Sequence, residues 1–170
     1  MKKITQLILA GMMIISMNLN AKQDTKSFVK QYKNQDGFTV VTIGKPAMKL
    51  INLFAKMSDN EASQIISRVN GIQVLAFDKG WDKNRGEAFN NEALAFCDDN
   101  QYDELIEMVE SGETVKIFCK IEGESITGLI VLNRANNNSS AEMVCLSGKF
   151  TFDDLQTITN RNGKNLIGLN

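Results

Sequence analysis

The segment TVKIFCKIEGESITGLIVLN, residues Thr114–Asn133, contains two runs of β-branched and other apolar residues that meet at Gly123. Runs of this composition favour extended strands, and a glycine between two of them is typical of a hairpin turn. A third run, AEMVCLSGKF (Ala141–Phe150), follows a polar loop rich in asparagine and serine. The three runs together predict a C-terminal antiparallel meander of three strands.

Two further β-rich stretches precede the meander. GFTVVTIG (Gly37–Gly44) is bounded by glycines, and IQVLAF (Ile72–Phe77) follows an expected turn at Asn70-Gly71. Because helical segments separate these strands, we expect an α+β fold with about five strands in a mostly antiparallel sheet and helices packed on one face. The alternative is a mixed sheet in which the first two strands pair in parallel across their helical crossover.

Apolar spacing and capping signals place the helices. Pro46 suits the first position of a helix in which Met48, Ile51 and Phe54 recur at helical spacing. Ser58 with Glu61, and Thr151 with Asp154, match the capping box and should each start a helix. The other expected helices are one over Thr25–Asn34, one that carries Phe89 and Phe96 and starts near Glu87, and one that carries Tyr102, Leu105, Ile106 and Val109 after a cap within Asp98–Asn100.

The N-terminus has the order of a secretory signal peptide over residues 1–21. Lys2 and Lys3 precede the largely apolar stretch Ile4–Met17, and Ala21 supplies a small residue at the exit. An N-terminal amphipathic or core helix is the alternative. We expect a single domain over residues 22–170, located in the periplasm, with no transmembrane segment after signal removal. No cysteine follows the apolar stretch, so no lipid attachment is expected there.

The chain contains no histidine, which removes the catalytic triads that use imidazole and most zinc sites. The acids from Asp98 to Glu110 lack the turn glycine and closing glutamate of a calcium loop and are expected to start a helix and line its solvated face. We therefore expect no metal and no cofactor. The formal net charge of −1 gives no reason to expect a nucleic-acid partner. A small carboxylate-based enzyme or a small-ligand carrier stays open as an alternative.

The three cysteines, Cys97, Cys119 and Cys145, are expected to be buried structural thiols. Cys119 alternates onto the same strand face as Val115 and Ile117, which suits core packing. Cys97 precedes two aspartates, and these carboxylates are expected to raise its pKa and weaken it as a nucleophile. One disulfide involving Cys97 is the alternative, because an exported protein can form one.

The segment DKGWDKNRGEAF (Asp78–Phe89) holds the single tryptophan, Trp81, among the cations Lys79, Lys83 and Arg85. A loop aromatic among cations has the composition of a binding hot spot. Alternatively, Trp81 folds back onto the core and staples the loop. The sequence favours an exported, non-enzymatic binding or regulatory protein with an envelope protein as partner, and these four residues are its candidate partner-binding site.

Several segments resemble one family. These are GFTVVTIG, GIQVLAFD, YDELIEMVESGETVKIFCKIEGESITGLIVL and LSGKFTFDDLQTI. They are similar to the domain-of-unknown-function family DUF4252, small exported proteins of Bacteroides-type bacteria. The resemblance implies an exported α+β domain with no assigned activity. Many members look like lipoproteins, from which this chain departs by lacking the lipobox cysteine, and many are encoded beside extracytoplasmic sigma factors, which suggests envelope regulation.

Overall fold

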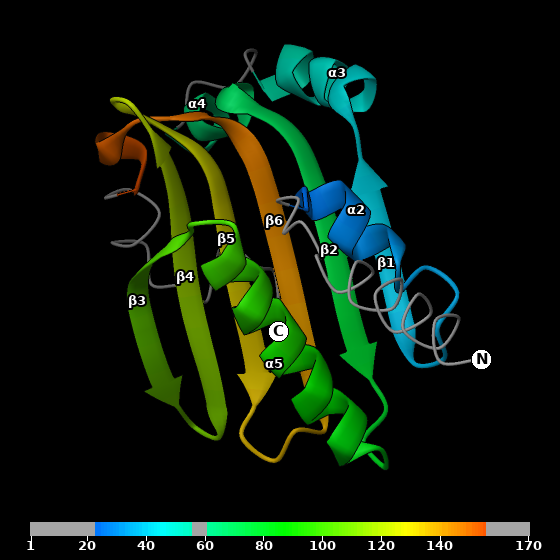
Figure 1. Cartoon of the computed structure of the whole chain (residues 1–170). Coiled ribbons are helices and arrows are strands. Elements are labelled where there is room, and N and C mark those ends of the chain that lie inside the picture. The colour runs from blue at the N-terminus through cyan, green and yellow to red at the C-terminus, as the bar shows by residue number, and fades with distance from the viewer. Residues whose placement is uncertain (1–22, 56–60, 156–170) are drawn as a thin grey trace, which may run out of the picture.

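The computed structural model describes residues 23–55 and 61–155; the predicted signal peptide (residues 1–21) and Ser58 of the first capping box lie outside them. A six-stranded sheet forms the centre of the fold, in the strand order β1-β2-β6-β5-β4-β3 (Figure 1). The strands are β1 (Phe38–Ile43), β2 (Val69–Asp78), β3 (Asp103–Glu110), β4 (Glu113–Glu122), β5 (Ser125–Ala135) and β6 (Ser140–Phe150), and the helices are α2 (Thr25–Lys30), α3 (Lys45–Ala55), α4 (Glu61–Arg68) and α5 (Lys83–Asp99).

The architecture is α+β with an antiparallel sheet, as the sequence predicts. The hairpin at Gly123 joins β4 to β5, and β6 follows as the next neighbour. The meander has four strands rather than three, because β3 pairs with β4 as well. β1 and β2 pair antiparallel, so the mixed-sheet alternative is wrong. The sheet therefore has six strands, one more than expected.

The additional strand, β3, lies where a helix through Tyr102 and Val109 was expected. Ser111 and Gly112 have positive φ angles of 49° and 91°, the geometry of a two-residue hairpin loop. The hairpin brings the carboxylates of Glu104 and Glu107 to 2.9 Å and 3.4 Å from Lys116 Nζ. Pairing with β4 thus overrides the helical propensity of this acidic segment, and the acids line an edge strand instead of a helix face.

The core is divided between the two faces of the sheet. Phe118, Ile130 and Cys145 face α2 and α5 in one hydrophobic cluster. Their neighbours in sequence, Cys119 and Leu129, point to the opposite face, where a second cluster includes Met48 of α3 and, at its margin, Ile65 of α4. The helices therefore lie on both faces of the sheet, not on one, and α5 crosses the front of the sheet in Figure 1.

Three element boundaries also differ from the expected ones. α2 ends at Lys30 rather than at Asn34. α5 begins at Lys83, four residues before the expected Glu87, because the Asp82 side chain accepts a hydrogen bond from the Arg85 backbone N–H at 3.0 Å and caps the helix. The expected turn at Asn70-Gly71 is instead part of β2, where the register with β6 shifts between Val69 and Gly71. An asparagine–glycine pair is tolerated there as a bulge within a longer strand.

The capping box at the C-terminal end is confirmed. The backbone N–H of Thr151 donates to Asp154 Oδ2 at 2.7 Å, and the Asp154 N–H donates to Thr151 Oγ1 at 3.2 Å. Residues 152–155 form the helical turn that follows. The Arg68 guanidinium of α4 also pairs with the Asp154 carboxylate, which fastens this turn to the neighbouring helix.

Candidate functional site

The loop between β2 and α5 presents Trp81 at the surface. The side chain is 75% exposed, so the indole does not pack into the core. Lys79 Nζ lies 5.2 Å from the centre of the indole ring, within the range of a cation–π contact. The same ammonium group is 3.1 Å from the Asp36 carboxylate, and the Asp82 N–H donates to the Lys79 carbonyl at 2.8 Å. The tryptophan thus stands on a turn that is held from two sides.

The two remaining cations of the predicted site differ in their surroundings. Lys83 is exposed in the first turn of α5. Arg85 is half-buried between α5, the α2–β1 connection and β1. Its guanidinium is 3.0 Å from the Glu92 carboxylate and 2.9 Å from Gln35 Oε1, and it lies over the ring of Phe38. The structure therefore brings Lys79 and Trp81 together and leaves Lys83 accessible, whereas Arg85 is engaged in contacts within the domain.

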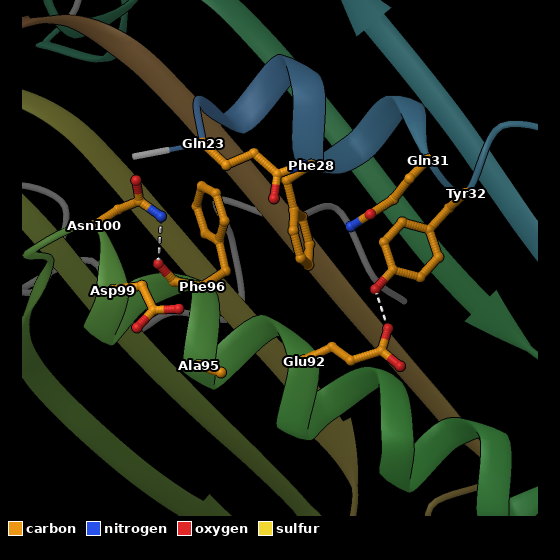
Figure 2. A pocket seen from close by; sticks show the side chains of 9 residues that line it. All are labelled: Gln23, Phe28, Gln31, Tyr32, Glu92, Ala95, Phe96, Asp99 and Asn100. Carbon is orange, nitrogen blue, oxygen red and sulfur yellow. Dashed lines mark hydrogen bonds between the residues drawn. The ribbon is translucent and has the colours of Figure 1, made fainter. Parts of the chain in front are cut away.

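A pocket of about 300 Å³ opens between α2 and α5 (Figure 2). Its apolar wall is formed by Phe28 and Phe96, whose ring centres are 4.5 Å apart. On the polar side the Tyr32 hydroxyl donates to the Glu92 carboxylate. The residues that line the pocket are Gln23, Phe28, Gln31, Tyr32, Glu92, Ala95, Phe96, Asp99 and Asn100.

Three of the polar side chains of this pocket are hydrogen-bonded within the domain: Tyr32, Glu92 and Asn100. Glu92 receives both the Tyr32 hydroxyl and the Arg85 guanidinium, and Asn100 Nδ2 donates to the Phe96 carbonyl at 2.9 Å. Burial raises the pKa of Tyr32, and its bond to the Glu92 carboxylate raises it further. The Tyr32 hydroxyl therefore stays protonated at neutral pH and can serve in the pocket as a hydrogen-bonding group rather than as a base.

All three thiols are buried and free. Burial raises the pKa of Cys97 and of Cys145 to about 12, and it also raises the pKa of Cys119. For Cys97 burial, rather than the neighbouring aspartates, is the cause. Cys97 and Cys145 belong to the cluster beneath α5, whereas Cys119 lies in the cluster on the opposite face. The sheet thus separates Cys119 from the other two.

The family model described as Domain of unknown function (DUF4252) matches residues 32–158. The chain belongs to this family. The match begins at Tyr32, which lines the pocket, and includes Trp81 and the whole sheet. No curated protein and no solved structure matches the chain.

In this DUF4252 domain, the described residues hold no group of three or more cysteine, aspartate and glutamate side chains arranged to bind a metal ion. Within the same ranges, none of the helices is long and apolar enough to cross a membrane. Sequence reasoning missed the pocket, because its central contact joins Tyr32 and Glu92, which are 60 residues apart. The local sequence signal reached only as far as the expected helix over Thr25–Asn34, which includes Phe28 and Tyr32.

Proposed function

We propose that this DUF4252 protein is an exported, non-enzymatic binding protein of the cell envelope, and that Trp81 anchors a protein partner. The observation that carries the proposal is a large aromatic side chain, 75% exposed, on a turn fixed by Lys79. Tryptophan is enriched among the residues that dominate binding energy at interfaces. Exposure of one such ring has no benefit for the folding of the domain, so a partner is the better reason for it.

The surroundings of Trp81 suit an anchor. Lys79 contacts the ring and the Asp36 carboxylate, so it limits the motion of the indole before a partner arrives. A side chain that is already ordered loses less conformational entropy on binding. Lys79 and the exposed Lys83 also set positive charge beside the ring, so a partner with acidic residues around an apolar pocket would match this site.

The test is chemical crosslinking in the native envelope, followed by co-purification with the intact protein or with Trp81→Ala. We expect the variant to lose the captured partner, because an interface anchor contributes about 2 kcal/mol or more to binding. Phe152→Ala, which removes another exposed aromatic (58%), serves as the matched control and should retain the partner. Capture of the same proteins by all three forms would contradict the proposal.

Two measurements on the purified protein make this result interpretable. Trp81→Ala should change the free energy of unfolding by no more than about 0.5 kcal/mol, as is usual for a surface substitution. The emission of the single tryptophan should be red-shifted and readily quenched by acrylamide. A large loss of stability on substitution would instead make Trp81 a structural residue.

Export is the second part of the proposal, and it rests on the signal-like residues 1–21. Protein isolated from the native cell should begin at or near Lys22 and should be found in the periplasmic fraction. An intact N-terminus at Met1 in the cytoplasm would contradict it.

A small-ligand carrier is the second candidate function, favoured by the pocket of about 300 Å³ between α2 and α5. Ala95 lines the pocket and its side chain is exposed, so Ala95→Trp should fill the space without disturbing the core. Mass spectrometry of the denatured native protein would detect a retained ligand. A ligand that is lost in Ala95→Trp and kept in Trp81→Ala would favour the carrier.

A further inference from the structure

The face of the sheet opposite α5 carries a continuous row of aliphatic side chains across all six strands. Each member is the direct cross-strand partner of the next. The row, which we call the aliphatic row, is Val41 (β1), Val74 (β2), Val144 (β6), Val131 (β5), Ile117 (β4) and Ile106 (β3). Directly opposed β-branched side chains touch, so together they form one uninterrupted apolar band.

None of the residues of the aliphatic row belongs to either hydrophobic cluster of the described residues. A neighbouring row lies two residues along each strand and runs from Ile43 and Ile72 to Cys119. Met48 of α3, Phe150 and Leu155 cover this neighbouring row in the second core cluster. In the aliphatic row only Ile117 is buried, and Val41 is 43% exposed. The second core cluster therefore ends one row before the aliphatic row.

The next row on the same face is polar at its centre. Glu142 of β6 and Asn133 of β5 are direct cross-strand partners there. Asn133 Oδ1 is buried and has no hydrogen-bond partner, and burial raises the pKa of Glu142. A buried acceptor without a donor is costly.

The charged strand residues on this face are all of one sign. Strand alternation places Glu142 on it in the row next to the aliphatic row, and Asp78 and Glu113 one row further along their strands. The cations of β4 and β5 lie on the other face of the sheet, with Phe118 and α5. They are Lys116, Lys120 and Arg134. Among the described residues of these strands, the face therefore combines an apolar band with carboxylates and has no cation of its own.

We propose that this face binds a basic amphipathic helix of a partner protein. Its apolar stripe would pack on the aliphatic row, and its lysine or arginine side chains would meet the Glu142 carboxylate in the next row. The six strands span about 24 Å across the sheet. A partner helix of 17 residues, the same number as in α5, would be about 25 Å long and would cross all six strands. A second copy of this chain would set carboxylates against carboxylates, which disfavours self-association through this face.

The test measures binding of a fluorescein-labelled synthetic helix of 17 leucine and lysine residues, with leucine on one face only, to the full chain. The control probe has glutamate in place of every lysine. We expect only the lysine probe to bind. The double variant Val131→Thr/Val144→Thr keeps the β-branched shape but removes two apolar methyl groups, so it should weaken binding about tenfold. Glu142→Gln should weaken it as well.

Matched substitutions outside the face should leave the affinity unchanged. Val109→Thr changes an exposed valine of β3 that pairs with Thr114 on the other face, and Glu124→Gln changes an exposed acid in the β4–β5 turn. Equal binding of both probes, or equal weakening by Val109→Thr and the double variant, would overturn the proposal.

Two other occupants of this sheet face would give distinct experimental results. Sedimentation of a dimer that the double variant dissociates would assign the face to a second copy and overturn the proposal. Residues 156–170 contain Arg161 and Lys164 and no acid. Tighter probe binding by Arg161→Glu/Lys164→Glu in the full chain would make this segment the occupant and would also overturn it. An unchanged affinity in that variant supports a separate partner.

Discussion

Gly86 of α5 lies against the carbonyl of Asn138 in the β5–β6 loop, so closely that a Cβ atom at Gly86 would be 2.2 Å from that oxygen. In an open helix, Gly→Ala stabilises by about 0.5–1 kcal/mol. Here the backbone of Asn138 would have to move, so we expect Gly86→Ala to destabilise by about 1–3 kcal/mol, as overpacking does.

Gly80→Ala is the control for this prediction, because the nearest atom to its Cβ would be 3.9 Å away. It should be neutral or slightly stabilising in chemical denaturation. Equal stability of the two variants would show that α5 can shift away from the loop without cost.

Glu142→Gln should stabilise the fold at neutral pH. Burial raises the pKa of Glu142, so the folded state prefers the protonated acid. That preference contributes fully below the ordinary glutamate pKa of about 4.3 and is lost as pH rises through the folded-state pKa. The thermal midpoint of the variant should exceed that of the parent protein at pH 7, and the gap should close towards pH 4. Glu124→Gln should show no such trend.

The three cysteines should resist alkylation in the folded protein at pH 8 and react once it is unfolded. Burial keeps each thiol protonated and out of contact with the reagent. Cys119→Ser should cost about 1–3 kcal/mol, because it places a hydroxyl in an apolar cluster. Cys119→Ala separates this polar cost from the loss of volume. Rapid labelling of the folded protein would contradict the prediction.

The Arg68–Asp154 pair should couple α4 to the C-terminal capping box. Burial alone would raise the pKa of Asp154, but hydrogen bonds from Thr151 and Arg68 outweigh it and lower the pKa. This stabilisation is present at neutral pH and is lost as pH falls through the folded-state pKa of Asp154. Asp154→Asn should therefore destabilise by about 1–3 kcal/mol at pH 7.

A double-mutant cycle with Arg68→Met measures this coupling directly. The matched cycle on Lys120 and Glu122, a surface pair with an N–O distance of 4.0 Å, should give a coupling energy near zero. Similar coupling energies in the two cycles would mean that the capping box, not the ion pair, stabilises this turn.

Local sequence signals predicted most of the sheet. β1, β4, β5 and β6 have β-rich composition and glycine or polar turns, and these agree with their tertiary pairing. β3 was mistaken for a helix because Leu105, Ile106 and Val109 also fit helical spacing, and the deciding contact, with Lys116, lies in the next strand. The start of α5 was misplaced because Asp82 was not identified as its cap.

The candidate sites also divide into those that local sequence signals predicted and those that they did not. Composition alone found Trp81 and Lys79, which are close in sequence and in space. The pocket contact between Tyr32 and Glu92 and the aliphatic row could not be predicted, because each depends on residues far apart in the chain. The row in particular exists only once five strand registers are fixed, and a one-residue slip in any of them would turn its side chains to the other face.

The pairing of β2 with β6 also determines how the fold can be completed. The Ser147 hydroxyl bonds the carbonyl of Gly71, 76 residues earlier in the chain, at 3.3 Å. The four-stranded meander from β3 to β6 needs only hairpins between consecutive strands. The β1–β2 pair, by contrast, stays a separate two-stranded unit until β6 has been made. Closing so long a loop slows folding, so the nascent chain cannot assemble its sheet until nearly all of the domain has been synthesised.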